Sequence, residues 1–183
     1  DYRAPDLVGA ALEAAIGTRS GLSILDAGCG TGKCGKYLKP RAAFLAGVDL
    51  SAGMLAKAGR LGLYDQLARG ELTAFLEAKN AAFDVVVCAD TLCYFGRLDA
   101  FAAAARTALR PEGLLVFTVE ALPDDAEAAF HLAANGRYAH SEAYVRATLA
   151  ERSFALLDLS RAQLRTENAE PVIGLVVTAK RPG

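Results

Sequence analysis

Several features that would assign a protein to a specialised class are missing from this sequence of 183 residues. It has no tryptophan, one methionine and two histidines, and its 20 basic and 21 acidic residues leave a formal net charge of −1. That charge gives no general attraction to nucleic-acid phosphates or anionic lipids. No apolar run approaches the roughly 18 to 20 residues of a membrane helix, and the N-terminal residues lack a secretory pattern. We therefore expect a cytoplasmic protein that binds neither nucleic acid nor membranes.

The cysteine spacing is equally uninformative for metal binding. The four cysteines form two pairs, each separated by four residues: Cys29 with Cys34, and Cys88 with Cys93. Metal sites prefer closer ligand pairs, and His131 and His140 are the only histidines that could complete a zinc shell. The sequence therefore predicts no metal, and reduced, mostly buried thiols.

The most informative stretch runs from Ile24 to Gly32, with the sequence Ile-Leu-Asp-Ala-Gly-Cys-Gly-Thr-Gly. Its apolar start is typical of a buried parallel strand, and the residues after Gly32 favour a helix. Glycines in such a strand-to-helix turn let the backbone approach a ligand, and amide groups at the helix start point outward. Asp26, just before the glycines, would repel a pyrophosphate but attract a cation. The pattern predicts a nucleotide-sized cradle for a cationic ligand.

Asp26 to Gly32 resembles the first motif of the class I S-adenosylmethionine-dependent methyltransferases, Asp-x-Gly-x-Gly-x-Gly. The resemblance implies an α/β, Rossmann-like, doubly wound fold: a seven-stranded, mostly parallel sheet with an antiparallel last strand and helices on both faces. It also implies that the turn holds the methionine part of S-adenosyl-L-methionine, whose product is S-adenosyl-L-homocysteine. The cofactor-binding residues expected here are Asp26, Gly28, Cys29, Gly30, Thr31 and Gly32.

A second acid, Asp49, follows an apolar strand over residues 42–48 and lies 23 residues after Asp26. At this spacing nucleoside-binding folds place an acid on the ribose hydroxyls, although Asp49 could instead be the N-cap of a helix beginning near Ala52. Asp49 to Leu55 also matches the second motif of the family, in which the following residues pack on adenine. The resemblance therefore adds Leu50 and Met54 to the cofactor site, with core packing of Met54 as the alternative.

Two further acids follow predicted strands. After a strand over residues 63–67, Glu71 matches the family acid that accepts the adenine amino group, with Leu72 beside it, although loop acids are common. Asp90 follows the strand Phe83–Ala89 and enters the crevice at the carboxyl edge of the sheet. The following Thr91-Leu92 lacks the Pro-Pro-Tyr of amide and base methyltransferases and resembles small-molecule members. We add Glu71, Leu72 and Asp90 to the cofactor site and expect a small-molecule acceptor.

Hydrophobic content of 53% suits one domain over residues 1–183. Residues 1–17 predict a leading helix, which packs on the sheet or covers the cofactor through Tyr2 and Arg3. Residues 121–152 form the expected substrate side, with a short helix over residues 124–132, a turn at 135–136 and a helix from Glu142.

Tyr138 and His140 are the catalytic candidates, because a histidine near neutral pKa can accept a proton from a substrate hydroxyl or amine. A structural histidine is the alternative. The last two strands, over residues 154–164 and 172–180, predict an edge hairpin. Arg165, just after the first of them, would contact an anionic substrate or solvent.

The runs 48–51, 64–67, 137–141 and 171–174 together resemble methyltransferase domains attached to tetratricopeptide repeats, which implies such a region before Asp1. The expected activity is methyl transfer to an O or N nucleophile of a small molecule. A non-catalytic S-adenosylmethionine-binding or scaffold protein is the alternative. An NAD(P)-dependent oxidoreductase is disfavoured, because its Gly-x-Gly-x-x-Gly needs glycine where Lys33 stands.

Overall fold

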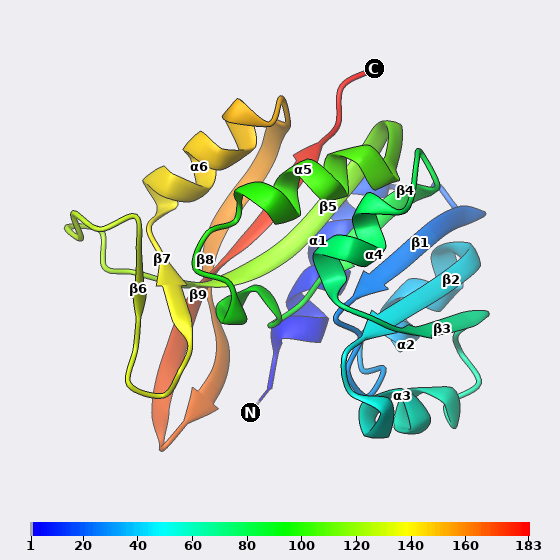
Figure 1. The fold of residues 1–183 in the computed structure, drawn as a ribbon, viewed down its shortest axis with the longest axis horizontal. Coiled ribbons are helices and arrows are strands. Elements are labelled where there is room, and N and C mark those ends of the chain that lie inside the picture. Colours follow the sequence, from blue (N-terminus) through cyan, green and yellow to red (C-terminus); the bar gives the residue numbers. More distant parts are fainter. Residues whose placement is uncertain (1) are drawn as a thin grey trace.

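The computed structural model describes residues 2–183 as alternating helices and strands (Figure 1). The helices are α1 (Ala4–Ile16), α2 (Gly35–Leu38), α3 (Ala52–Gly59), α4 (Leu72–Glu77), α5 (Asp99–Ala108) and α6 (Glu142–Glu151), with 3-10 turns η1 (Lys39–Arg41) and η2 (Leu92–Tyr94). The strands are β1 (Leu22–Ala27), β2 (Ala42–Asp49), β3 (Gln66–Arg69), β4 (Phe83–Cys88), β5 (Leu109–Ala121), β6 (Phe130–Leu132), β7 (Tyr138–His140), β8 (Ala155–Glu167) and β9 (Glu170–Lys180). Within this range, every helix is too short or too polar to cross a bilayer.

The sheet confirms the predicted fold class. Strands β3, β2, β1, β4 and β5 run parallel in that order, and β9 joins β5 antiparallel, with β8 antiparallel to β9. These are the seven strands that the sequence predicts, including the final hairpin. Such an order places the carboxyl ends of β1, β2 and β4 at one edge, where open α/β sheets bind ligands.

Residues 130–140 depart from the prediction. The helix expected over residues 124–132 is wrong: Phe130–Leu132 is a strand that pairs antiparallel with Tyr138–His140. The resulting ribbon extends the sheet to nine strands among the described residues, because β7 also pairs with the end of β5. Phe130 packs against Tyr138, His140 and Tyr144, and this aromatic cluster stabilises the strand where a helix would turn Phe130 away.

The central strands are buried on both faces, which explains their nearly continuous apolar sequences. Along β1, Ile24 packs with the α1 side chains Val8 and Leu12, whereas Leu25 packs on the opposite face with Phe101 of α5. Figure 1 shows α4, α5 and α6 over that second face. Helices on both faces hold the sheet edge that carries the candidate site.

The start of β3 differs from the prediction. Helix α3 ends at Gly59 and β3 begins at Gln66, three residues later than the strand predicted over 63–67. Asp65 explains the shift, because its carboxylate accepts a hydrogen bond from the Leu45 amide at 2.8 Å and contacts Lys39. That side-chain contact fixes the chain just before the strand.

Candidate functional site

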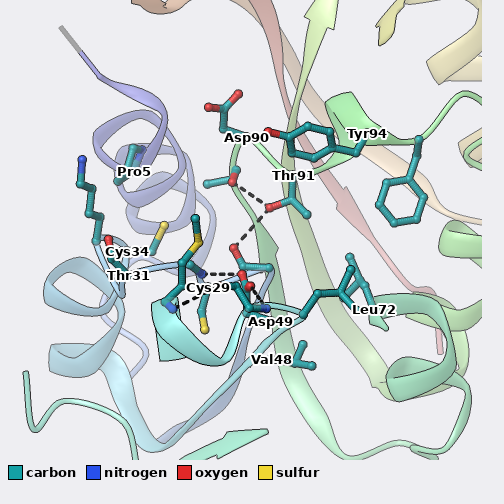
Figure 2. Close-up of a pocket in the computed structure, with 18 of the residues that line it drawn as sticks. Pro5, Cys29, Thr31, Cys34, Val48, Asp49, Leu72, Asp90, Thr91 and Tyr94 are labelled. Atoms are coloured by element: carbon teal, nitrogen blue, oxygen red, sulfur yellow. Dashed lines mark hydrogen bonds between the residues drawn. The ribbon is translucent and has the colours of Figure 1, made fainter. Parts of the chain in front are cut away.

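A cavity of about 450 Å³ opens at the carboxyl ends of β1, β2 and β4 (Figure 2). That size suits a drug-sized ligand. Ten of the twelve residues predicted to bind the cofactor line it: Gly28, Cys29, Gly30, Thr31, Asp49, Leu50, Met54, Glu71, Leu72 and Asp90. The structure therefore brings most of the predicted cofactor residues together, although which of them touch a ligand remains a prediction.

The glycines of the turn have different roles. Gly28 and Gly30 have positive φ angles of 73° and 53°, which glycine adopts without strain. A Cβ on Gly28 would lie 2.3 Å from Thr91 Oγ1, so this glycine permits close packing against the end of β4. A Cβ on Gly30 would meet only Met54 Sδ within 4 Å. Gly30 thus leaves the cavity open. Gly32 does not line the cavity, and its missing side chain makes room for Leu61 and Tyr64.

Asp49 connects the end of β2 to the glycine turn. Its Oδ2 accepts a hydrogen bond from the Gly30 amide at 2.8 Å, and its Oδ1 accepts one from the Ser51 amide at 2.8 Å. The N-cap of α3 is Ser51, whose hydroxyl accepts from the Met54 amide, so the N-cap alternative for Asp49 is wrong. Each carboxylate oxygen keeps a lone pair for a further donor.

Asp26 lies beneath the turn and not on the cavity wall. It is fully buried, and the Tyr64 hydroxyl donates a hydrogen bond to its Oδ2 at 2.6 Å. Burial raises the pKa of Asp26 to about 7, although the Tyr64 hydrogen bond opposes that shift. Asp26 is therefore not among the residues that line the cavity, and its expected role in cofactor binding stays a prediction.

Glu71 also lines the cavity, and it is the N-cap of α4. Its carboxylate accepts hydrogen bonds from the amides of Thr73 at 2.9 Å and Ala74 at 2.7 Å. Partial burial raises the pKa of Glu71, but these hydrogen bonds outweigh it and leave the pKa below its usual value. Glu71 is thus an ionised cap beside apolar Leu50 and Leu72. Its contact with adenine stays a prediction.

The other end of the cavity carries Asp90, Tyr94 and Arg137 (Figure 2 shows the first two). Asp90 has a φ of +51°, an uncommon value for a residue with a side chain. Its Oδ1 accepts hydrogen bonds from Arg165 at 2.8 Å and Arg137 at 3.4 Å. Burial raises the pKa of Asp90, and the two guanidinium groups offset only part of that rise.

Arg165 is buried in an ion-pair cluster and does not line the cavity. Its Nη2 lies 2.5 Å from Glu120 Oε1 and 3.0 Å from Glu167 Oε2. Neither interpretation made from the sequence, an anionic substrate or solvent, fits an arginine that is 7% exposed. Arg165 instead compensates acids contributed by strands β5 and β8 and by the β4 end.

Three side chains near this cluster are spaced closely enough to hold a metal ion, but the Arg137 guanidinium lies against all three. The ligand atoms of Asp90, Cys93 and Glu120 lie within 4.8 Å of one another. Arg137 Nη1 lies 3.4 Å from the first two and 3.5 Å from the third. All four cysteines are free and buried, and burial raises the pKa of each thiol. Among the described residues, the positive group that Asp90, Cys93 and Glu120 contact together is the Arg137 guanidinium.

The two catalytic candidates lie outside the cavity wall. His140 is fully buried, its Nε2 lies 3.0 Å from the Gly96 carbonyl oxygen, and its ring stacks on Tyr144. Burial lowers its pKa, so the imidazole is neutral at pH 7. Tyr138 packs edge-on against Phe130. Strand β7 pairs with β5 and β6, and both of its aromatic side chains pack against Phe130 of β6. This packing favours the structural alternative for His140.

Sequence reasoning gave too little weight to several cavity residues. The wall also includes Tyr2, Pro5, Lys33 and Cys34. The Lys33 ammonium lies over the Tyr2 ring, 4.6 Å from its centre. Arg137, which lies in the run 137–141 noted in the sequence, also lines the cavity. The Asn-Gly turn at 135–136, flanked by alternating apolar residues, is a hairpin signal that could have placed it.

Comparison with known proteins agrees with this geometry. Residues 25–117, just over half of the chain, match a family model described as a methyltransferase domain. The chain belongs to this methyltransferase family and has the fold of class I S-adenosylmethionine-dependent methyltransferases, as the sequence motif predicts. The expected methyl donor, S-adenosylmethionine, is confirmed at the level of the family.

Two curated relatives share part of the chain. A malonyl-[acyl-carrier protein] O-methyltransferase from Enterobacter lignolyticus (strain SCF1) is 32% identical over 117 residues, which are 62% of this chain and 46% of the relative. The chloroplastic magnesium protoporphyrin IX methyltransferase of Arabidopsis thaliana is 35% identical over 80 residues, 42% of this chain and 25% of the relative. The alignments thus span less than half of either relative.

Solved structures show the same fold. One is the Burkholderia thailandensis 1,6-didemethyltoxoflavin-N1-methyltransferase with bound 1,6-didemethyltoxoflavin and S-adenosylhomocysteine, with a TM-score of 0.80, 22% identity and coverage of 100% of this chain and 80% of that one. Another is an S-adenosylmethionine-dependent methyltransferase from Mesorhizobium loti, with a TM-score of 0.71, 23% identity and coverage of 94% and 96%.

Proposed function

We propose that this protein is an S-adenosylmethionine-dependent methyltransferase that moves a methyl group to an O or N nucleophile of a small molecule. The observation that carries the proposal is the position of Asp49. Its carboxylate is tied to the open glycine turn through Gly30 and faces a cavity of about 450 Å³ at the sheet edge. We further propose that residues 1–183 work as one domain, with residues 121–152 on the acceptor side.

The residues of the cavity fit the donor in two respects. At one end, Asp49 supplies acceptor oxygens for ribose hydroxyls, while Leu50 and Leu72 offer apolar surface to adenine. Beside Asp49, which accepts a hydrogen bond from the Gly30 amide, the open wall at Gly30 leaves space where the backbone can come close to a ligand. When bound, the donor supplies a methyl group on a positively charged sulfur, which leaves as a neutral thioether.

The chain's own residues then mainly hold and orient the reactants. The acceptor's electron pair forms the new bond to carbon, the sulfur keeps the pair of the broken bond, and the acceptor's proton passes to solvent. This chemistry requires no catalytic triad, which is consistent with a buried, neutral His140. One curated relative is named as an O-methyltransferase and one solved structure of the same fold as an N1-methyltransferase, so the proposal includes both O and N transfer.

Two other functions make different predictions. A scaffold protein of the same fold would bind the donor and transfer nothing. A nicotinamide oxidoreductase would bind NAD, although Lys33 replaces the third glycine of its motif.

Calorimetric titration with S-adenosylmethionine, S-adenosylhomocysteine and NAD separates these functions. We expect binding of the two sulfur ligands and none of NAD. Asp49→Ala should weaken S-adenosylhomocysteine binding by about 1.5 to 3 kcal/mol, because charge-assisted hydrogen bonds are lost. The matched control is Asp158→Ala, an exposed acid on β8, which should bind like the wild type. NAD binding without sulfur-ligand binding would overturn the proposal. Transfer of a radiolabelled methyl group to small acids, amines or phenols then tests catalysis.

A further inference from the structure

Two arginines meet at the acceptor end of the cavity, and they are held very differently. Arg165 is 7% exposed and forms ion pairs of 2.5 to 3.0 Å with three acids. Arg137 lines the cavity, and its contacts with Asp90 and Glu120 are longer, at 3.4 and 3.5 Å. Well-formed charge-assisted hydrogen bonds are near 2.7 to 2.9 Å. Arg165 is therefore fully engaged, whereas Arg137 is only loosely held.

The free side of Arg137 faces an aromatic residue. Its guanidinium carbon lies 5.3 Å from the centre of the Tyr94 ring, and its Nη2 contacts the Tyr94 hydroxyl at 3.3 Å. Tyr94 also lines the cavity and is 61% exposed (Figure 2). A guanidinium group binds a carboxylate through two parallel N–H donors, and an aromatic face beside it favours a flat ligand.

Three carboxylates and two guanidinium groups meet around this pair, because Arg165 also contacts Glu167. Asp90 and Glu120 would repel an anion, but Arg165 contacts the same oxygens of both acids that Arg137 shares. Arg137 can thus turn toward a ligand without leaving either acid unpaired in a buried setting, which would be costly. Arg137 lines the cavity at this end and can direct its donors to one carboxylate of a ligand.

We propose that Arg137 and Tyr94 form the recognition site for a carboxylate on a flat methyl acceptor. The place of this site in a reaction rests on the function proposed above, but carboxylate binding itself does not. Arg137 acts here as a specificity residue at the end of the cavity away from Asp49, and the nucleophile that receives the methyl group is another part of the acceptor.

The test uses a matched set of probes. NMR titrations of the free and the S-adenosylhomocysteine-loaded protein would compare 4-hydroxybenzoate with the neutral 4-hydroxybenzamide and the cationic 4-(aminomethyl)phenol. The wild type should bind the benzoate at least about 10-fold more tightly than the other two. Arg137→Gln should remove that preference, because it deletes the charged fork.

Two further variants distinguish the loss of the guanidinium group from a general loss of structure. Arg137→Lys keeps the charge but loses the planar fork, so it should retain part of the preference. Arg146→Gln, an exposed arginine of α6 paired with Glu142, is the control and should behave like the wild type. Equal binding of the amide or the amine by the wild type, or an unchanged preference in Arg137→Gln, would overturn the proposal. Failure of S-adenosylhomocysteine to bind would overturn only the proposed function, since the probe preference is also measured on the free protein.

Discussion

The two ends of the cavity are built in different ways. At the end where we propose that the donor binds, a short stretch after β1 and Asp49, the last residue of β2, form part of the wall. There the amides of Gly30 and Ser51 donate hydrogen bonds to Asp49. At the acceptor end, Asp90 meets Arg165, which is 75 residues away in sequence, and Glu120 meets it across 45 residues. One end depends on backbone shape and the other on charges from distant strands. Substitutions at the two ends should therefore differ in how strongly they lower stability and ligand binding.

The largest expected effect comes from breaking the charge cluster. Arg165→Met would leave Asp90 and Glu120, whose side chains are 8% and 12% exposed, without their main partner. Removing one member of a buried ion pair costs on the order of 3 to 5 kcal/mol. Urea denaturation should show this loss in unfolding free energy, whereas Arg146→Gln should change it by less than about 0.5 kcal/mol. A loss as small as the control's would show that the cluster does not stabilise the acceptor end.

Backbone shape at the donor end is tested at Gly28. Gly28→Ala combines a positive φ with a Cβ that would overlap the Thr91 side chain, so we expect a loss of about 2 to 4 kcal/mol in stability and little remaining S-adenosylhomocysteine binding. Gly53→Ala in α3 is the matched control, because its Cβ would meet nothing closer than 3.9 Å. Calorimetry and thermal unfolding check both variants. Normal binding by Gly28→Ala would mean that the turn tolerates a side chain.

Asp26 predicts how stability depends on pH. Its folded pKa, about 7, lies above the usual value of 3.8, so the folded state binds its proton more tightly than the unfolded state. Its contribution to stability is complete below pH 4 and is lost as the pH rises toward 7. Asp26→Asn stays neutral, so its unfolding free energy relative to the wild type should rise between pH 5 and pH 8. A constant difference across this range would contradict this pKa.

The smallest effect on ligand binding is expected at His140. His140→Ala should leave S-adenosylhomocysteine affinity within about twofold of the wild type, because the imidazole contacts Gly96 and Tyr144 outside the cavity. Its loss should instead lower stability by about 1 to 3 kcal/mol, as for other buried polar groups. Calorimetry and denaturation distinguish these effects. A large loss of affinity with unchanged stability would return His140 to the list of site residues.

The same contrast explains how much the sequence could predict. The fold class, the glycine turn and Asp49 were predictable, because strand periodicity and motif spacing are local features. The position of Asp26 was not, because its partner Tyr64 is 38 residues away and draws the carboxylate beneath the turn. The roles of Arg137 and Arg165 depend on which of them is buried among acids from β4, β5 and β8, and no local pattern reports that. For the ribbon of β6 and β7, the sequence analysis recognised the turn at 135–136 but predicted a helix before it, where the structure has strand β6.

A crystal structure of the protein soaked with S-adenosylhomocysteine tests the central claim most directly. We predict that the ribose hydroxyls lie within hydrogen-bonding distance of the Asp49 carboxylate and that the backbone at Gly30 contacts the ligand. A ligand bound elsewhere, or an empty cavity at saturating concentration, would contradict the account.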